Sequence, residues 1–462
     1  MVNTVVVGLG RSGIGAARLL RTAGTNVMVI DSGKGEALER KAADLKNQGI
    51  AVQIKTPLLP ESFQSWQNTL QRVVISPGIA WDHPTLQDLR LHGVAIEGEM
   101  AVAWDALQHI PWIGITGTNG KTTVTHLLSH VLEHSGLIAP MAGNMGVSAA
   151  EMGLEIQEST TNHPDWLVME LSSYQIEAAE RIQPTIGIWT TLTPDHLERH
   201  GTLDNYRAIK RGLLERSELA ILNADDPDLR QQRKNWTHGL WVSADGPSPD
   251  GNPVDLWIDS EGWVREPEQA LFQAKALKLP GGHNLQNMLL VTAAARRIGL
   301  TATQIEAALQ AFKGVPHRLE PLGRLQGIAV FNDSKATNYD AAEVGLRAMQ
   351  GPTVVLAGGS MKLGDASGWL KQLTQQACAV VLFGDGATEL QRIIQTSSYP
   401  GAVVCCSDMA EAVDAAVDLA QQKSASNILL SPACASFDQY TDFEARGDHF
   451  RRLIATHPLN KS

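Results

Sequence analysis

The sequence predicts an α/β protein built from three consecutive domains. Short apolar runs alternate with amphipathic helical stretches along most of the chain, which is the pattern of parallel sheets covered by helices. Two glycine-rich loops each follow an apolar run and precede a helical pattern, as phosphate-binding loops do. The chain has 462 residues, and domains of roughly 150 residues would make about three of them.

The first domain is expected over residues 1–99. Its strand candidates are TVVVGLG, VMVID, RVVISPG and VAIEG. A glycine-rich loop follows the first candidate and Asp31 ends the second, so the domain is expected to be Rossmann-like. A helical pattern after Gly98 (EMAVAWDALQ) leads to the next strand, and the boundary is placed near residue 99.

The second domain is expected over residues 100–314, with a P-loop ATPase-like fold. Its strand candidates are WIGITG, WLVMEL, TIGIWTTL and LAILN. Residues 239–279 carry scattered turn residues and short β runs such as VDLWID, which predicts a small antiparallel addition. The third domain, residues 315–462, begins near VPHR and is expected to be Rossmann-like. Its strand candidates are IAVFND, PTVVLAGG, AVVLFGD, AVVCC and NILLSPA.

Composition excludes several classes of partner. The net charge is −11, from 49 acidic and 38 basic residues, so the surface repels nucleic-acid phosphates and anionic membranes. No apolar stretch is long enough to span a bilayer, and the first residues lack the basic segment of a signal peptide. The four cysteines form no CxxC and are expected to be buried free thiols in a reducing compartment; they are Cys378, Cys405, Cys406 and Cys434. We therefore expect a cytoplasmic protein without nucleic-acid or membrane partners.

The most specific motif is GITGTNGKTT, residues 114–123, between a strand pattern and a helix pattern. Backbone N–H groups in such a turn point at phosphate oxygens, and the helix N-terminus adds a favourable partial charge. Lys121 can reach the outer phosphates, and the Thr122 hydroxyl can ligate Mg²⁺. The spacing departs from GxxxxGK[ST], because Ile115 stands where that pattern has its first glycine. The alternative is a structural turn before a helix.

GTNGKTT resembles the ATP-binding loop of the Mur ligases and of the related folylpolyglutamate synthetases. Further runs resemble the same family in the same order, and together they touch all three expected domains. The resemblance implies an ATP-dependent ligase that forms an amide bond. The loop residues that it assigns to ATP are Gly117, Thr118, Asn119, Gly120, Lys121, Thr122 and Thr123.

Three runs in the second domain resemble the metal site of this family. Glu170 in MELSSYQIE and His196 in TLTPDHLERHG each follow a strand pattern, and Asp195 can orient His196. Lys210 in TLDNYRAIKRG corresponds to the family's carbamate-bearing lysine, whose anionic oxygens can bind a metal that an ammonium would repel. Outside the resemblance, a strand-end glutamate, a loop histidine and a helix lysine more often have no such role. The metal is expected to be Mg²⁺, with Mn²⁺ as a substitute, and its ligands Thr122, Glu170, His196 and carbamylated Lys210.

The other ATP contacts come from later runs. GGHNLQN places Asn284 and Asn287 one helical step apart, where amides can bind the adenine edge, although Asn284 could instead cap a helix. VPHRLE carries His317 and Arg318 at the expected hinge, and Arg318 resembles an arginine that contacts ATP. In FNDSKATN, the resemblance assigns Asp333 to the ribose.

The resemblance assigns the incoming amino acid to the third domain. GGSMKLG has Ser360 near a position where related ligases often carry an acid. SPACASFDQYTDFEARG resembles the run of the D-glutamate-specific members, although its phenylalanine could also pack in the core. The residues expected to contact the amino acid are Thr337, Lys362, Ser436 and Phe443. Catalytic roles are implied for Lys121, Glu170, His196, Lys210, Lys335 and Lys362.

The loop GLGRSG, residues 8–13, fits the GxGxxG dinucleotide fingerprint, and Asp31 at the end of the next strand provides the acid of that fingerprint. Taken alone, this pattern favours NAD. The diphosphate of a UDP-sugar can occupy the same helix N-terminus equally well. The resemblance implies a UDP-substrate held by Arg11, Ser12, Asp31, Ser32, Ser76, Pro77, Gly78, Asn144 and His196.

The reaction that the resemblance implies is the ATP-dependent addition of D-glutamate to UDP-N-acetylmuramoyl-L-alanine through an acyl phosphate. It would serve peptidoglycan precursor synthesis, and thereby cell-wall biogenesis, cell shape and cell division, and the protein is expected to be a monomer. One alternative is another ligase of the superfamily, which adds L-alanine or a diamino acid, or glutamate to folate. Others are an NAD-dependent oxidoreductase and a nucleotide-binding switch. The lack of a DNPR run argues against a diamino-acid-adding ligase, and the UDP-type first block argues against the folate enzyme. GTNGKTT argues against the oxidoreductase, and the later runs argue against the switch.

Overall fold

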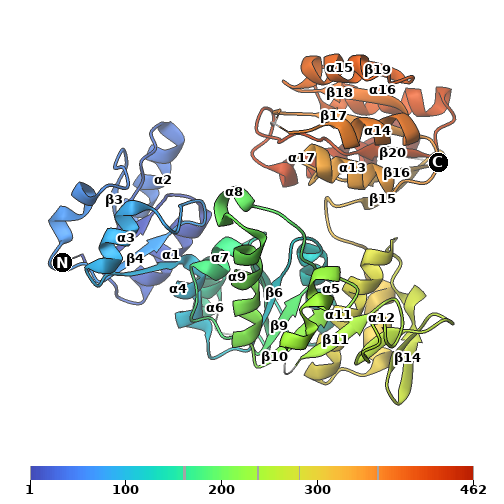
Figure 1. The fold of residues 1–462 in the computed structure, drawn as a ribbon. Helices are drawn as coiled ribbons and strands as arrows, with labels where there is room; N and C mark the ends of the chain where they lie inside the picture. The colour runs from blue at the N-terminus through green and yellow to red at the C-terminus, as the bar shows by residue number, and fades with distance from the viewer. Residues whose placement is uncertain (1, 160–162, 237–238, 280, 362–363, 461–462) are drawn as a thin grey trace. The chain divides into compact units, whose positions relative to one another are not determined.

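The computed structural model describes residues 2–159, 163–236, 239–279, 281–361 and 364–460. The chain divides into two compact units (Figure 1): unit 1 is Met1–Lys278 with Gly282–Phe312, and unit 2 is Leu279–Gly281 with Lys313–Ser462. Unit 1 contains two sheets and unit 2 contains one, each packed with helices. The predicted α/β class is confirmed. No helix in the described part of the chain is long and apolar enough to cross a membrane.

The N-terminal sheet of unit 1 is parallel throughout, in the order β3-β2-β1-β4-β5. Its strands are β1 (Thr4–Val7), β2 (Val27–Ile30), β3 (Ala51–Gln53), β4 (Arg72–Ile75) and β5 (Ala95–Gly98). Its helices are α1 (Arg11–Thr22), α2 (Glu36–Asn47) and α3 (Pro84–Leu91). β1 consists of β-branched residues that are all buried, as a central parallel strand requires. The strand order reverses at β1, and ligands bind at such switch points.

The second sheet of unit 1 has nine strands in the order β14-β13-β12-β11-β10-β9-β6-β8-β7. They are β6 (Trp112–Thr116), β7 (Met141–Gly143), β8 (Leu167–Glu170), β9 (Ile186–Trp189), β10 (Leu219–Asn223), β11 (Leu240–Ser243), β12 (Leu256–Ile258), β13 (Trp263–Glu266) and β14 (Gln269–Gln273). The helices are α4 (Glu99–Leu107), α5 (Lys121–His134), α6 (Ala149–Glu158), α7 (Ser173–Glu177), α8 (Leu197–His200), α9 (Leu203–Arg216), α10 (Pro227–Gln231), α11 (Gly282–Ile298) and α12 (Ala302–Ala311).

The prediction of a small antiparallel addition over residues 239–279 is wrong in part. β11 pairs in parallel with β10, and β12 pairs in parallel with β11, so both continue the main sheet. Only β13 and β14 run antiparallel to their neighbours. β11 is buried along its whole length and contacts α11, and this cover is what a parallel strand needs.

The sheet of unit 2 has the order β15-β16-β20-β17-β18-β19, and only the β15–β16 pair is antiparallel. Its strands are β15 (Glu320–Leu325), β16 (Ile328–Asn332), β17 (Thr353–Gly358), β18 (Ala377–Phe383), β19 (Ala402–Cys405) and β20 (Asn427–Leu430). Its helices are α13 (Tyr339–Arg347), α14 (Ser367–Gln376), α15 (Ala387–Thr396), α16 (Met409–Gln422) and α17 (Phe443–Thr456). Residues of β17 alternate between two buried cores, one formed with α16 and α17 and the other with α13, α14 and α15.

The cysteines are free thiols, as predicted, but they are not all buried. Cys434 is buried, and Cys378 and Cys406 are partly buried. Cys405 is exposed because it ends β19, which is the edge strand of its sheet, so the prediction of burial is wrong there.

Candidate active site

The GTNGKTT loop connects β6 to α5, and its glycines have conformations that favour glycine. Gly117 has a φ of 149° and Gly120 a φ of 84°. A Cβ on Gly117 would lie 1.9 Å from Thr190 Oγ1, and one on Gly120 would lie 2.8 Å from Asn287 Oδ1. The loop is therefore shaped by close neighbours on two sides, which favours a phosphate site over an incidental turn.

Lys121 is the first residue of α5, and its side chain turns back over the loop. Its Nζ donates to the carbonyl oxygens of Gly117 and Thr118, at 2.9 Å each. Thr122 and Thr123 follow in the first turn of the helix and are buried. The predicted phosphate ligands are thus grouped at a helix N-terminus, where anions are stabilised.

The loop after β9 holds the GTNGKTT loop from the side. The Thr118 N–H donates to the Thr191 carbonyl at 2.8 Å, and the Asn119 N–H donates to Thr191 Oγ1 at 3.0 Å. Thr118 Oγ1 donates to the Thr193 carbonyl at 3.1 Å. These bonds fix backbone groups that would otherwise have to be ordered by the nucleotide.

Lys210 lies on α9 with only 1% of its surface exposed, so it is not a surface-helix lysine. Its Nζ donates to the Gly117 carbonyl at 3.0 Å and to Thr116 Oγ1 at 3.3 Å. Burial holds the pKa of Lys210 well below its usual value, and the Lys121 ammonium lowers it further. Both effects favour the neutral amine.

Glu170 is the last residue of β8 and is 1% exposed, so the alternative of a solvated loop acid is wrong. Its Oε1 accepts a hydrogen bond from Asn144 Nδ2 at 2.9 Å. Its Oε2 is buried and has no hydrogen-bond partner within the described ranges. A buried carboxylate oxygen is costly unless a donor or cation meets it.

His196 precedes α8 in a left-handed conformation, with a φ of 54°. Its Nε2 lies 3.5 Å from Asp195 Oδ2, so Asp195 is close enough to orient the ring, and the His196 side chain is 43% exposed. The ring centres of Tyr174 and Tyr206 lie 5.1 and 6.4 Å from that of the imidazole. His196 therefore packs against two aromatic rings, and the rest of its side chain is open to solvent.

Tyr206 is a site residue that the sequence analysis missed. It is buried on α9; its hydroxyl lies 3.3 Å from Thr118 Oγ1, and its ring centre lies 4.6 Å from Lys210 Nζ. Burial raises the pKa of Tyr206 to about 12, so its hydroxyl stays protonated and able to donate. Its position four residues before Lys210, one helical turn away, was the available signal.

The donors predicted to bind a metal come from the start of α5, the end of β8, the residue before α8, and α9. Glu170 provides the hard carboxylate oxygen that Mg²⁺ prefers, and among the described residues its Oε2 has no hydrogen-bond partner. No group of three His, Cys, Asp or Glu side chains that could hold a metal occurs in the parts of the chain that are described. Mg²⁺ commonly takes one or two carboxylates together with substrate phosphates, so the residues present fit a metal that is shared with a nucleotide.

Asn284 and Asn287 lie within α11, which starts at Gly282, so Asn284 is not a helix N-cap. Both amides are buried, and Asn287 Nδ2 donates to Asn284 Oδ1 at 3.2 Å. The Asn287 oxygen lies against Gly120, where Thr190 is also a close neighbour. The asparagine pair therefore lies beside the GTNGKTT loop.

In the N-terminal part of unit 1, Val7 at the end of β1 pairs with Ile30 at the end of β2 and with Ile75 at the end of β4. The three strands therefore end level with one another, and the loops that follow them lie side by side. Gly8 has a φ of 108°, and a Cβ on it would lie 2.4 Å from Ser76 Oγ. A Cβ on Gly13 would lie 2.0 Å from the Gly8 carbonyl, so glycine lets the helix approach the strand end.

The predicted UDP contacts are grouped around these loops. Asp31 accepts hydrogen bonds from the backbone N–H groups of Leu9 and Gly33, at 2.7 Å each, so its carboxylate also shapes the glycine-rich loop. Arg11 donates to the Gly146 carbonyl, which brings α1 to the loop that carries Asn144. Ser12 lies in the first turn of α1, Ser32 follows Asp31, and Pro77 and Gly78 follow Ser76.

In unit 2, Asp333 directly follows β16 and is 5% exposed. It accepts hydrogen bonds from the Leu319 N–H at 3.2 Å and from Ser431 Oγ at 3.0 Å. Burial raises the pKa of Asp333 to about 7. Arg318 is exposed beside this buried group.

In unit 2, the structure places the predicted residues Lys335 and Phe443 against one another. Lys335 Nζ lies 5.0 Å from the centre of the Phe443 ring, and Phe443 is only partly buried, so its ring is not simply part of the core. Ser436 is 2% exposed, and Thr337 is partly exposed. Lys362 lies outside the described residues.

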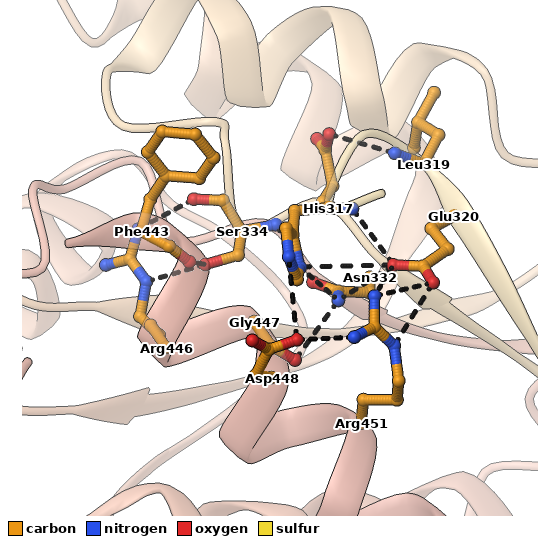
Figure 2. Close-up of polar contacts among 11 residues, drawn as sticks. His317, Leu319, Glu320, Asn332, Ser334, Phe443, Arg446, Gly447, Asp448 and Arg451 are labelled. Atoms are coloured by element: carbon orange, nitrogen blue, oxygen red, sulfur yellow. Dashed lines mark hydrogen bonds and ion pairs between the residues drawn. The ribbon is translucent and has the colours of Figure 1, made fainter. Parts of the chain in front are cut away.

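His317 is fixed where the chain enters unit 2 (Figure 2). Its φ is 60°, and its Nδ1 lies 3.0 Å from Asn332 Nδ2. Its backbone N–H donates to Glu320 Oε2 at 2.9 Å, and Arg451 pairs with the same glutamate. A Cβ on Gly447 would lie 2.1 Å from the imidazole, so α17 approaches this histidine closely.

Comparisons with known proteins cover nearly the whole chain. Three family models match: "Mur ligase MurD-like, N-terminal domain" over residues 2–98, "Mur ligase middle domain" over 115–295 and "Mur ligase, glutamate ligase domain" over 317–434. The UDP-N-acetylmuramoylalanine–D-glutamate ligase of Parasynechococcus marenigrum (strain WH8102) is 68% identical over 98% of both chains. The protein of the same name from Synechocystis sp. (strain ATCC 27184 / PCC 6803 / Kazusa) is 44% identical, also over 98% of both.

Among solved structures, the UDP-N-acetylmuramate-alanine ligase MurC of Thermotoga maritima matches with a TM-score of 0.58 and 19% identity, over 98% of this chain and 99% of that one. A pseudomurein peptide ligase type C from Methanothermus fervidus matches with a TM-score of 0.55 and 19% identity, over 98% and 99%. At this level of identity, the likeness establishes a shared fold.

Proposed function

This chain belongs to the Mur ligase family, and from that premise we propose that it adds D-glutamate to UDP-N-acetylmuramoyl-L-alanine, with ATP converted to ADP and phosphate. The observation that carries the proposal is 68% identity, over 98% of both chains, to a protein named for that reaction. The reaction serves peptidoglycan precursor synthesis in the cytoplasm, and the protein acts as a monomer. The alternative of an NAD-dependent oxidoreductase has no support from the relatives.

The three expected domains divide the work. Residues 1–99 bind the UDP-substrate, residues 100–314 bind ATP, and residues 315–462 bind the amino acid. The matched ranges 2–98, 115–295 and 317–434 support boundaries near these positions.

The ATP phosphates rest on the GTNGKTT loop, where fixed N–H groups and Lys121 offset their charge. Asn284 and Asn287 continue the nucleotide site along α11. The family resemblance also assigns Arg318 and Asp333 to ATP. Magnesium, when bound, neutralises phosphate charge and makes the γ-phosphorus more electrophilic. The residues that would hold it are Thr122, Glu170, His196 and Lys210, and Mn²⁺ could substitute.

Lys210 serves as a metal ligand in carbamylated form. A neutral, buried amine can add carbon dioxide to form a carbamate, with release of a proton, and the carbamate oxygens are anionic. The support is the position of Nζ, 3.0 Å from the Gly117 carbonyl at the start of the phosphate loop. An ammonium at this position would repel the metal and would compete with it for the phosphate oxygens.

The reaction has two steps. The carboxylate of the UDP-substrate attacks the γ-phosphorus, and ADP leaves, which gives an acyl phosphate. The amine of D-glutamate then attacks the acyl carbon, loses a proton, and phosphate leaves from the tetrahedral intermediate. Both steps build negative charge on oxygen, which Lys121, Lys335 and Lys362 stabilise; one such preorganised partner is worth about 3 kcal/mol.

Phosphate release tests this proposal. The full-length protein is incubated with MgATP and UDP-N-acetylmuramoyl-L-alanine, and D-glutamate, L-glutamate, L-alanine, L-lysine or meso-diaminopimelate is added in turn. We expect release only with D-glutamate, and we expect Lys121→Ala to abolish it without unfolding the protein. Comparable turnover with L-alanine or a diamino acid would reject the proposed substrate while leaving the ligase chemistry in place.

A further inference from the structure

Arg446 is a fully buried arginine on α17, and its guanidinium reaches three loops at the carboxyl ends of strands in unit 2. Figure 2 shows its contact with Ser334, in the first of these loops. Its Nε donates to Ser334 Oγ at 3.0 Å and its Nη2 to the Ser334 carbonyl at 2.8 Å, just after β16. Its Nη1 donates to the carbonyls of Cys434 and Ala435, at 3.1 and 3.2 Å, after β20. A longer contact of 3.4 Å joins Nη1 to the Gly358 carbonyl, at the end of β17.

These loops lie side by side because β20 is the neighbour of both β16 and β17. Ser334 directly precedes Lys335, and Ala435 directly precedes Ser436. Ser334 Oγ also donates to the Phe443 carbonyl at 2.8 Å. The Arg446 guanidinium is therefore bonded to the residues just before Lys335 and Ser436, and Ser334 links it to Phe443.

The packing around Arg446 leaves room for it only because the neighbouring loop is built from glycine. Gly359 has a φ of 124°, and a Cβ on it would lie 2.1 Å from the Ala435 carbonyl and 3.0 Å from Arg446 Nη1. The Gly358–Gly359 pair thus lets the β17 loop close on the same guanidinium that holds the other two.

A buried cation is costly unless its charge is satisfied. Over the described ranges, Arg446 forms hydrogen bonds to carbonyl and hydroxyl oxygens and no ion pair. Burial lowers the pKa of Arg446 to about 10, so the side chain is still protonated at neutral pH. An apolar side chain of similar volume would fill the same space but would leave the carbonyls of Ser334, Cys434 and Ala435 without this donor. Arg446 therefore serves the loops that it contacts.

We propose that Arg446 is a positioning residue for the incoming amino acid: it fixes the loops after β16, β17 and β20 so that Lys335, Ser436 and Phe443 stand where they bind D-glutamate. This inference rests on the proposed function. The planar guanidinium donates from three nitrogens in fixed directions, whereas a lysine ammonium donates from one, so lysine cannot replace it.

Steady-state phosphate release by full-length Arg446→Lys and Arg446→Met tests the inference. We expect the KM for D-glutamate to rise roughly tenfold or more in both variants, and the KM for the UDP-substrate, which is bound by unit 1, to stay within about threefold. Phe450→Leu is the matched control, because Phe450 is buried one turn further along α17 in the core against the sheet. It lowers stability, and we expect it to leave both KM values in place.

Hydrogen exchange supplies a readout that is independent of activity. Amides of residues 334–338 and 434–437 should exchange faster in both Arg446 variants than in Phe450→Leu. If Arg446→Met does not fold, Ser334→Ala removes one partner of the guanidinium and should change the same KM in the same direction. An unchanged KM for D-glutamate, or loop exchange equal to that of Phe450→Leu, overturns the positioning role.

Failure of the proposed function can be distinguished from failure of the positioning role of Arg446. If the wild type releases no phosphate with D-glutamate, the proposed function fails, and loop exchange alone decides the role of Arg446. Faster exchange then supports the positioning of these loops, and unchanged exchange rejects it.

Discussion

Replacing Asp333 with asparagine tests how a buried carboxyl group is tolerated in unit 2. Burial raises the pKa of Asp333 to about 7 from its ordinary value of 3.8, and hydrogen bonds from Ser431 and from the Leu319 N–H offset this only in part. Below pH 3.8 the group is protonated in both the folded and the unfolded chain. Between pH 3.8 and about 7 only the unfolded chain is ionised, so the free energy of unfolding falls as pH rises. Above this window the loss is complete and constant.

The size of the effect follows from the two pKa values. At pH 8 their difference corresponds to roughly 4 kcal/mol of lost stability, of which about 3 kcal/mol is lost between pH 5 and pH 8. An asparagine at position 333 has no charge to lose. Its Oδ1 can accept from the Leu319 N–H and its Nδ2 can donate to Ser431 Oγ, because that hydroxyl can turn. We therefore expect Asp333→Asn to stabilise unit 2 at pH 8 by several kcal/mol, and by much less at pH 5.

Unit 2 can be followed by itself because Trp369 is the only tryptophan among residues 313–462. It is 1% exposed and packs against Tyr339, with ring centres 5.5 Å apart. The protein is labelled with 5-fluorotryptophan, the resonance of Trp369 is assigned with Trp369→Phe, and urea unfolding is followed by ¹⁹F NMR at pH 5 and pH 8. The urea midpoint of this resonance should rise in Asp333→Asn at pH 8, and its change between the two pH values should shrink.

Glu99→Gln is the matched control. Glu99 is 2% exposed, and burial raises its pKa to about 7, but it lies in unit 1. Its replacement should leave the Trp369 midpoint where it is in the wild type. A lower midpoint for Asp333→Asn at pH 8, or an equal pH dependence in variant and wild type, would refute the reasoning.

Three further predictions concern unit 1. Lys210→Ala should lose most phosphate release, and added acetate or propionate should restore part of it by supplying the missing carboxylate; restoration by chloride salts as well would contradict this. Asp31→Ala should weaken binding of the UDP-substrate in calorimetry, leave ATP binding unchanged, and give no heat with NAD. Gly117→Ala should raise the KM for ATP roughly tenfold or more, because its Cβ would meet Thr190 Oγ1 at 1.9 Å. Gly136→Ala, at a φ of 89° in open space, is the control for backbone strain and should leave that KM unchanged.

The sequence was sufficient wherever an apolar run ended in a distinctive loop. The strands before GLGRSG and GITGTNGKTT were predicted because β-branched residues form buried parallel strands and glycines mark the turns that follow. Glu170 and Lys210 were assigned from resemblance, and the structure adds that both are buried beside Asn144 and the Gly117 carbonyl. Burial of a polar side chain leaves no pattern in a single sequence, so this part of the site required coordinates.

Short or irregular strands were missed for a related reason. β3, β7 and β15 are brief or contain glycine and proline, and β15 is held in place by antiparallel pairing with β16. Pairing of this kind depends on tertiary contacts more than on local composition. Arg446 lies in the same run as Ser436 and Phe443, and its hydrogen bonds to Ser334 and Ala435 distinguish it from an ordinary helix arginine.

Three buried ionisable side chains of this protein occupy the same kind of position in the fold. Lys210, Asp333 and Arg446 are each bonded to a loop at the carboxyl end of a parallel strand. Such loops cannot satisfy their backbone groups by extending the sheet, so buried side chains must hold them. Removing these groups can therefore raise stability, as expected for Asp333→Asn, and still impair the reaction, because the loops that bind substrates would lose the contacts that order them before the substrates arrive.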